Sequence, residues 1–334
     1  MMKIGLIGYG YWGPNLARNF NQNSDLDLSY ICDFSADRLK TASALYKQTK
    51  FVNDPEVLFK DTTLDAIAVA TPVSTHFELA KRALESGKDV WLEKPMTEKV
   101  EQAEELIELA EKNKRVLHVD HTFVYTGAVR KIKELIDKGE LGDLIYYDST
   151  RVNLGLFQQD VDVIWDLAPH DISIMDYLIG ERPQAVVATG SGHFDRGLED
   201  IAYLTFYYPR NIIAHINVNW LSPVKVRTTL IGGQKMMLVW NDLEPDEKIK
   251  IYDKGVQVRT KEGKYNLLVN YRSGDMWSPK IEQTEALKVM AEAFVGYIEN
   301  GGTVVNDGIA GLNVVKMLTA SNQSLSNKNQ TVYL

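Results

Sequence analysis

Short apolar runs alternate with helical patterns through the first 120 residues of the chain. Several of the apolar runs are almost continuously hydrophobic, which is typical of parallel strands covered on both faces. The strand-like runs are residues 3–7, 26–31, 51–52, 66–70, 90–92 and 116–119. Strands that alternate with amphipathic helices predict a doubly wound parallel sheet, which is an α/β fold.

Two of the helices between these strands have recognisable ends. The first is expected to begin near Ser74, a good N-cap residue, and to close at Gly87. The second is expected to begin near Thr97 and to repeat apolar residues at helical spacing from Val100 to Ala110.

The pattern changes from about residue 144, where strand-like segments follow one another directly. These segments are residues 144–154, 185–194, 201–208, 212–220, 226–231 and 236–240. In residues 212–220 apolar side chains alternate with His215, Asn217 and Asn219, so one face is apolar and the other polar. One helix near residues 171–179 interrupts the strands, and two helical patterns close the chain. We therefore expect an α+β domain with a mostly antiparallel open sheet.

Chain length and composition limit the organisation and the partners. A chain of 334 residues is longer than one hydrophobic core usually supports, so two domains are expected: a dinucleotide-binding domain at 1–122 and a substrate-binding and oligomerisation domain at 123–334. The net charge of -8 argues against broad contact with nucleic acid or an anionic membrane. The sole cysteine, Cys32, excludes an intrachain disulfide, and with no membrane-spanning stretch or signal peptide a cytoplasmic location is expected.

A glycine-rich motif of the form G-x-G-x-x-G directly follows the first predicted strand and opens a helix. Gly8 permits the tight turn, Gly10 allows a pyrophosphate to approach the backbone, and Gly13 allows helix and strand to pack closely. Tyr11 and Trp12 lie inside the motif and are cofactor-binding candidates with it. The N-terminus of the helix offers free N–H groups to the phosphates.

An acidic residue follows the second predicted strand at the position where dinucleotide sites use one. Asp33 lies about 20 residues beyond Gly13, where a carboxylate accepts hydrogen bonds from ribose hydroxyls and repels a 2′-phosphate. This favours NAD over NADP. The alternative rests on Arg38, whose guanidinium is within sequence reach of a phosphate.

Two further motifs end the fourth and fifth predicted strands, at the edge where open parallel sheets bind ligands. Thr71 and Pro72 end the fourth strand, with His76 in the helix that follows, and Glu93 and Lys94 end the fifth, before a proline. We include all five in the cofactor site. Taken alone, Glu93 and Lys94 are equally compatible with an exposed ion pair. The sequence predicts no metal site.

Together these motifs resemble the glucose-fructose oxidoreductase/inositol dehydrogenase (Gfo/Idh/MocA) family over essentially the whole chain. The resemblance continues through the Gly-Glu-Leu-Gly run at 139–142 and reaches residues 166–170, which match the family's D-x-G-x-H motif with Ala168 in place of glycine. The chain departs from the family at residues 120–123, where Asp-His-Thr-Phe replaces Asn-x-Arg-Phe. The family's contacts from that segment are therefore not carried over.

The resemblance implies that Lys94 and His170 flank the reacting carbon of an alcohol. His170 is the leading candidate for the proton acceptor, and Lys94 would hydrogen-bond the reacting oxygen or serve as the base itself. Asp166 would orient His170 or Lys94, or bind a substrate hydroxyl. Pro169 is expected to begin a helix, which places His170 in its first turn, where the helix dipole favours the neutral imidazole.

The substrate is less constrained than the cofactor. Arg151 and Asn153 share one strand face and can bind hydroxyls or a phosphate, or form a solvated face. This segment and residues 160–166 look like members that oxidise nucleotide-linked sugars, such as C3 of UDP-N-acetylglucosamine or its uronate for surface polysaccharides. An inositol or aldose is the alternative substrate. A non-catalytic NAD-binding ligand sensor is another reading, against which retention of Lys94 and His170 argues. The resemblance also implies a homodimer or homotetramer formed through the open sheet face.

Overall fold

A computed structural model describes residues 1–155, 161–194, 197–259, 268–302 and 304–334. The chain divides into two compact units, the first comprising Met1–Tyr125 and Thr284–Lys316 and the second Thr126–Gln283 and Met317–Leu334. This division differs from a single boundary near residue 122, because the segment Thr284–Lys316 returns to the first unit. Helix α9, Gly308–Ser326, contributes residues to both units.

The first unit contains the predicted parallel sheet, and its fold is confirmed. Its strands are β1 (Met2–Ile7), β2 (Leu26–Cys32), β3 (Lys50–Val52), β4 (Ala66–Val69), β5 (Asp89–Glu93) and β6 (Leu117–Asp120). They lie in the order β3-β2-β1-β4-β5-β6, and every neighbouring pair is parallel. The order reverses between β1 and β4, which is where doubly wound sheets bind ligands beyond the carboxyl ends of their strands.

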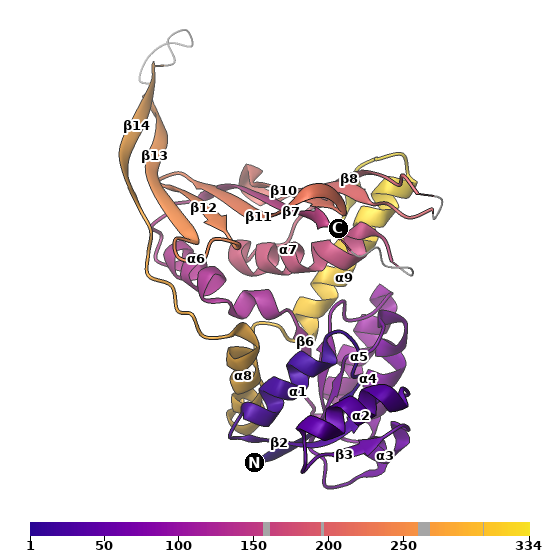
Figure 1. Cartoon of the computed structure of the whole chain (residues 1–334). Coiled ribbons are helices and arrows are strands. Elements are labelled where there is room, and N and C mark those ends of the chain that lie inside the picture. Colours follow the sequence, from indigo (N-terminus) through magenta and orange to yellow (C-terminus); the bar gives the residue numbers. More distant parts are fainter. Residues whose placement is uncertain (156–160, 195–196, 260–267, 303) are drawn as a thin grey trace. The chain divides into compact units, whose positions relative to one another are not determined.

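Helices cover both faces of this sheet. They are α1 (Gly13–Gln22), α2 (Ala36–Leu45), α3 (Glu56–Lys60), α4 (His76–Glu85), α5 (Val100–Asn113) and α8 (Ala286–Asn300). Figure 1 shows α1 and α8 on one side of the sheet and α4 and α5 on the other. The fully buried Trp91 of β5 packs edge-on against Phe20 of α1 and Phe294 of α8.

The helix ends differ in detail from the sequence expectation. A 3-10 turn at Val73–Thr75 comes before α4, so Thr75 rather than Ser74 is its N-cap residue. Likewise α5 begins three residues after Thr97, whose hydroxyl instead donates to the Lys99 carbonyl. Gly87 does adopt a positive φ of 75° just beyond α4, as expected for a residue that closes a helix.

The second unit contains a mostly antiparallel sheet, as predicted. Its strands are β7 (Leu144–Leu154), β8 (Ala185–Ser191), β9 (Ile201–Tyr207), β10 (Ile213–Asn219), β11 (Leu221–Gly233), β12 (Met237–Asn241), β13 (Ile249–Arg259), β14 (Leu268–Trp277) and β15 (Val332–Tyr333). The strand order is β14-β13-β12-β11-β7-β10-β9-β8-β15, and only β7 and β10 run parallel. The predicted alternation in β10 is confirmed, since Ala214, Ile216 and Val218 are fully buried.

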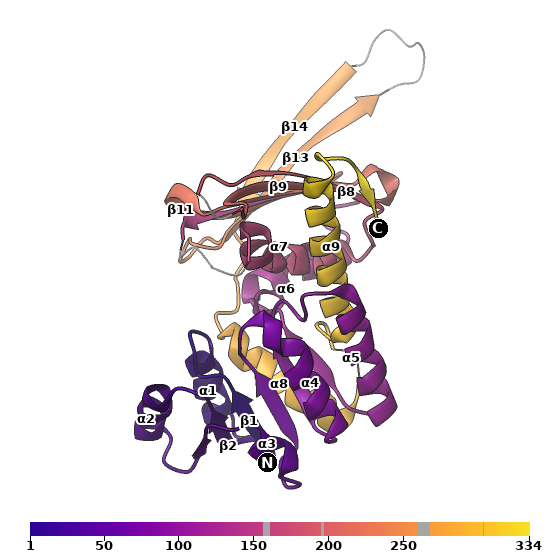
Figure 2. The ribbon, with the colours of Figure 1, turned by 90° about the vertical axis from the view of Figure 1, so that its right-hand side faces the viewer.

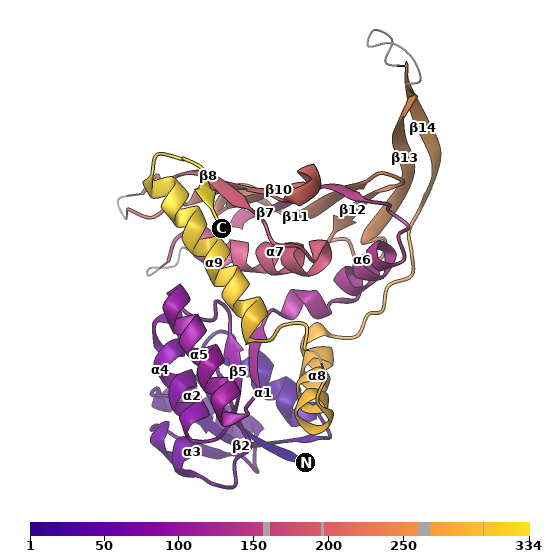
Figure 3. The same cartoon turned by 180° about the vertical axis from the view of Figure 1, so that it is seen from behind.

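Helices lie on one side of this second sheet. Figures 1 and 3 show α6 (Gly127–Asp137), α7 (Val163–Ile179) and the second half of α9 on the same side. Within the described part of this unit, no helix covers the opposite face. Tyr203, Tyr207 and Leu230 are among the exposed side chains of strands β9 and β11. Among the described residues, no helix combines the length and the apolar character that crossing a membrane requires.

The sequence reading missed strands β13, β14 and β15. Figure 2 shows β13 and β14 as a hairpin that projects from the rest of their sheet. Asp253, Lys254 and Gly255 interrupt the apolar alternation of β13, which hides the strand pattern. β15 has two residues, Val332 and Tyr333, and is too short to be recognised without its partner β8.

Candidate active site

The glycine-rich loop has the backbone geometry that a dinucleotide site needs. Gly8 has a φ of +99°, and a Cβ there would lie 2.4 Å from the Ala70 carbonyl oxygen. A Cβ on Gly13 would lie 2.3 Å from the Gly8 carbonyl oxygen, whereas Gly10 meets only the Arg38 guanidinium at 3.7 Å. The N-terminus of α1 has no side-chain cap. The loop and its unshared N–H groups therefore fit the pyrophosphate of a dinucleotide.

Asp33 and Arg38 lie together beside this loop. The Asp33 carboxylate accepts hydrogen bonds from the Tyr9 amide at 2.7 Å and the Ser35 amide at 2.8 Å. One guanidinium nitrogen of Arg38 is 3.4 Å from the same carboxylate, and the Arg38 side chain is largely exposed. In the sequence Asp33 favours NAD, whereas Arg38 is the basis of the NADP alternative. In the structure the two side chains form an ion pair. Tyr11, by contrast, is 90% exposed.

His76 is fully buried between the ends of β4 and β5. Its Nδ1 lies 2.9 Å from the Pro95 carbonyl oxygen and its Nε2 lies 2.9 Å from the Thr71 carbonyl oxygen. Both ring nitrogens thus face backbone oxygens, and burial, the largest cause, lowers the pKa of His76. The side chain links the turn at Thr71 and Pro72 to the turn after Lys94, so its contacts are with the protein backbone.

Lys94 follows β5 directly, and the Lys94–Pro95 peptide bond is cis. Glu93 precedes it and is the register partner of Asp120 on β6. Burial, and then the charge of Asp120, raise the pKa of Glu93 well above its usual range. Two buried carboxyl groups side by side avoid two adjacent charges when one keeps its proton. Burial beside Asp120 therefore favours the protonated form of Glu93. Its side chain accepts from the Lys94 amide at 3.2 Å.

Asp120 is the functional-site neighbour that the sequence reading did not single out. Its Oδ2 accepts hydrogen bonds from the indole N–H groups of Trp12 and Trp91, each at 3.3 Å, and its Oδ1 accepts from the Thr122 hydroxyl. Trp12 belongs to the glycine-rich loop, so Asp120 connects that loop to the strand end that carries Glu93 and Lys94. The only signal in the sequence was the departure from the family pattern at residues 120–123.

The second unit places Asp166 and His170 on one helix, but not as expected. Helix α7 begins at Val163, with the Asp162 side chain accepting from the Trp165 amide at 2.9 Å, and Pro169 lies inside it. The expectation that His170 lies in the first turn is therefore wrong. The helix dipole then gives no reason for a neutral His170 imidazole. Asp166 and His170 are four residues apart, which puts them on the same helix face. The Trp220 indole donates to Asp166 at 3.0 Å.

Arg151 and Asn153 differ in their surroundings. Arg151 is 3% exposed and its guanidinium forms an ion pair with Asp171 of α7, whose carboxylate also accepts from the Ser149 hydroxyl. Asn153 is partly exposed. Arg151 can bind a substrate, as predicted, only by giving up this buried ion pair with Asp171. Residues 156–160, part of the segment that suggested nucleotide-linked sugars, lie outside the described residues.

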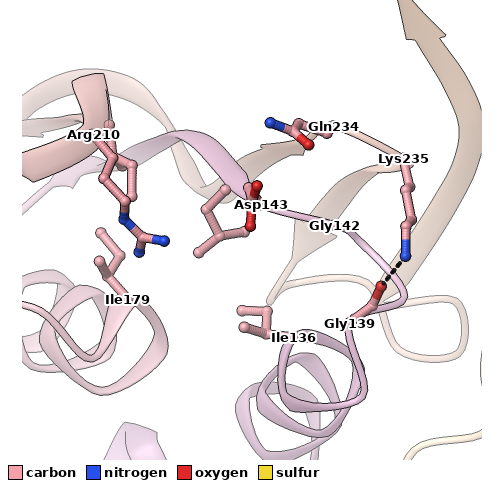
Figure 4. Close-up of a pocket in the computed structure, with 10 residues that line it drawn as sticks. Ile136, Gly139, Gly142, Asp143, Ile179, Arg210, Gln234 and Lys235 are labelled. Atoms are coloured by element: carbon pink, nitrogen blue, oxygen red, sulfur yellow. Dashed lines mark hydrogen bonds between the residues drawn. The ribbon is translucent and has the colours of Figure 1, made fainter.

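A cavity of about 460 Å³ in the second unit is lined by none of the predicted site residues. Figure 4 shows its walls, which include Asp143, Arg210, Gln234 and Lys235. Arg210 pairs with Glu181, and Lys235 donates to the Gly139 carbonyl at 3.1 Å. Arg210 and Lys235, the two cationic residues of the cavity wall, thus have protein partners, and the candidate catalytic site lies elsewhere.

The fold and the glycine-rich loop define an oxidoreductase with an NAD-binding Rossmann domain. Residues 2–121 match the oxidoreductase family with an NAD-binding Rossmann fold, GFO_IDH_MocA, and residues 129–239 match the GFO/IDH/MocA C-terminal domain. The chain belongs to the GFO/IDH/MocA family. The resemblance drawn from the sequence motifs and the expected NAD cofactor are thereby confirmed.

Three relatives illustrate the range of the family. An uncharacterized oxidoreductase, YdgJ of Escherichia coli, is 30% identical over 74% of this chain and 73% of its own length. A myo-inositol 2-dehydrogenase of Thermotoga maritima is 28% identical over 57% of this chain and 58% of its own. A UDP-N-acetylglucosamine 3-dehydrogenase of Acidithiobacillus ferrooxidans is 30% identical over 57% of this chain and 58% of its own. The latter two matches thus span little more than half of the relatives' length.

Solved structures show the same fold over the whole chain. The structure of UDP-N-acetylglucosamine 3-dehydrogenase GnnA from Acidithiobacillus ferrooxidans superposes with a TM-score of 0.83, covering 98% of this chain and 99% of that one at 22% identity. A putative myo-inositol dehydrogenase from Sinorhizobium meliloti gives a TM-score of 0.81 at 20% identity. At these identities the likeness establishes the fold and leaves the substrate to be argued.

Proposed function

We propose that this protein oxidises a secondary alcohol of a nucleotide-linked sugar, with C3 of UDP-N-acetylglucosamine or its uronate as the substrate position. The observation that carries the proposal is the retained acid–base set: Lys94 at the carboxyl end of β5, and Asp166 with His170 on one face of α7. A ligand sensor has no need of such a set. The relative that acts on UDP-N-acetylglucosamine and its matching fold support this substrate class.

Each proposed catalytic residue has a separate role. NAD, held by the glycine-rich loop and Asp33, would supply the hydride acceptor for the carbinol carbon. His170 takes the hydroxyl proton, and Asp166 orients the imidazole from the preceding turn of α7. Lys94 hydrogen-bonds the reacting oxygen and stabilises the negative charge that develops on it. The raised pKa of Glu93, beside Lys94, favours its protonated form, which would keep a further negative charge away from that oxygen.

The dinucleotide is held by the glycine-rich loop and by Asp33. Gly8, Gly10 and Gly13 allow the pyrophosphate to approach the N-terminus of α1, and Asp33 accepts from the adenosine ribose hydroxyls. Thr71, Pro72 and Glu93 belong to the strand ends that face the nicotinamide half. Asn153 is the better placed of the two β7 candidates to bind a substrate hydroxyl, because Arg151 is already paired.

A free polyol is the second candidate, favoured by the inositol dehydrogenases among the relatives, one of which is 22% identical over 98% of this chain. We further propose that the chain acts as a homo-oligomer through the helix-free face of its second sheet, and that it works in the cytoplasm. No contact with nucleic acid or membrane is part of this proposal.

A single-turnover panel separates the substrates. Protein in excess over substrate is mixed with NAD and, in separate reactions, UDP-N-acetylglucosamine, its uronate, myo-inositol and glucose, and the absorbance of reduced nicotinamide is followed. We expect a rise with a nucleotide-linked sugar that Lys94→Ala and His170→Ala both lose. A rise with myo-inositol or glucose alone would replace the nucleotide-sugar proposal by the polyol one. Tight NAD binding without a rise in any reaction would favour the sensor.

A further inference from the structure

Two of three fully buried histidines in the first unit have clear reasons to be buried. His76 has both ring nitrogens against backbone oxygens, each at 2.9 Å. The His118 ring packs against Trp91 at 4.6 Å and Phe294 at 5.3 Å between centroids, and its Nε2 faces the Asn306 amide at 3.2 Å. The protein thus supplies partners for His76 and for Nε2 of His118, whereas Nδ1 of His118 has none among the described residues.

His121 has no such account. It follows β6 directly and is 2% exposed, yet among the described residues neither of its ring nitrogens has a hydrogen-bond partner. Leaving a buried polar group unpaired costs about 1–3 kcal/mol, so nearly all such groups find a partner. Two unpaired nitrogens on one side chain, at the carboxyl end of a parallel strand, point to a partner that binds from outside the chain.

Burial and the nearby charge of Lys94 limit which chemical groups can bind His121. Burial, and then the nearby charge of Lys94, lower the pKa of His121 to about 3. The imidazole is therefore neutral at physiological pH and offers one N–H donor and one lone pair. A neutral group that both donates and accepts hydrogen bonds complements it, as a hydroxyl or a carboxamide does. A second cation is disfavoured because Lys94 already supplies one.

We propose that His121 is a further ligand-binding residue, whose neutral imidazole hydrogen-bonds a hydroxyl or carboxamide of a ligand bound beside Lys94. The inference rests on the proposed function, because the two sources of such a group are the nicotinamide carboxamide of NAD and a hydroxyl of the sugar. It assigns a role to residues 120–123, a segment in which the chain departs from the family pattern.

The test uses His121→Leu, which fills the same space without polar atoms, and His118→Leu as the matched control. If His121 serves only a ligand, the free His121→Leu protein melts at or above the wild-type temperature, because two unpaired polar groups are removed. Its ligand affinity falls about tenfold, the loss expected when one hydrogen bond disappears. His118→Leu instead melts lower, since Asn306 loses one of its hydrogen-bond partners and the stacking of the ring on Trp91 is lost. A merely structural role for His121 would give both variants the same lowered melting temperature.

Two binding measurements identify the ligand. NAD affinity is followed by tryptophan fluorescence without sugar, and sugar affinity with NAD present. Loss in the first arm assigns the carboxamide, and loss only in the second assigns the hydroxyl. If wild type turns over no sugar, the proposed function fails, while the NAD arm and the melting temperatures still decide the role of His121. Wild-type affinity of His121→Leu for NAD and for every sugar that the native protein binds would overturn the inference, as would a melting temperature as low as that of His118→Leu.

Discussion

Glu93 of the first unit and Asp171 of the second are both buried carboxyl groups, and they are stabilised in opposite ways. Asp171 of the second unit pairs with the buried guanidinium of Arg151 and accepts from Ser149. Glu93 of the first unit lies beside another acid, Asp120, and its pKa is raised well above its usual range. The charge of Asp171 is balanced by a cation of the protein. Glu93, in contrast, can gain or lose a proton, so the Glu93–Asp120 pair can respond to its surroundings. This pair is the one adjacent to Lys94.

The largest expected effect comes from breaking the ion pair. Arg151→Met leaves Asp171 buried without its cation, which is expected to lower the free energy of unfolding by roughly 3–5 kcal/mol. Urea denaturation measures it. Because an apolar pair of similar volume avoids the unpaired charge, the double variant Arg151→Met with Asp171→Leu should recover most of the loss. Failure of the double variant to recover would mean that Asp171 is needed for more than balancing Arg151.

A smaller loss is expected from the acid pair. Asp120→Leu keeps a similar volume but removes both acceptor oxygens, which leaves the Trp12 and Trp91 indoles and the Thr122 hydroxyl without this partner and should cost about 1–3 kcal/mol. Because Trp12 belongs to the glycine-rich loop, NAD affinity measured by fluorescence should fall as well. Unchanged stability and NAD affinity would show that the Trp12–Asp120 hydrogen bond does not hold the loop.

Glu93→Gln is expected to change stability least among the buried sites, because the amide imitates the protonated carboxyl group that the raised pKa of Glu93 favours. The pH dependence is the sharper measurement. A raised pKa means that folded Glu93 keeps its proton while unfolded Glu93 loses it above the usual value of 4.5, so wild-type stability falls as pH rises from there. Glu93→Gln removes that decline, and its stability relative to wild type should increase with pH. A constant difference between pH 4 and pH 9 would contradict a proton on Glu93.

The smallest effect is expected at the surface. Hydrogen bonds from Lys131, and then from Lys138, lower the pKa of Glu134 to about 2, but the side chain lies at the surface and is 41% exposed. Surface pairs contribute little and are screened by salt. The melting temperature of Glu134→Gln should match wild type at neutral pH in high salt, with any difference at low salt vanishing below pH 2. A loss that persists in high salt would indicate an unrecognised buried contact.

What could be predicted from the sequence depended on how local the determinants are. Gly8, Gly13 and Asp33 act through the turn and helix that directly follow their own strands, so the dinucleotide loop was predictable. The role of Asp120 was not, because it depends on the register of β5 with β6 and on a hydrogen bond from Trp12, which is 108 residues away in the sequence. Helix α7 was placed too late, because Pro169 resembles a first-turn residue while Asp162 is the actual N-cap.

Hydride transfer from one carbon is the central claim, and an isotope label tests it most directly. UDP-N-acetylglucosamine and its uronate carrying deuterium at C3 are incubated with the protein and NAD, and the recovered cofactor is analysed by mass spectrometry. The account predicts reduced cofactor that carries the deuterium, and none with Lys94→Ala or His170→Ala. Reduced cofactor without the label would contradict C3 as the reacting carbon. Cofactor that stays oxidised, with NAD bound and either sugar present, would contradict the proposed substrate class.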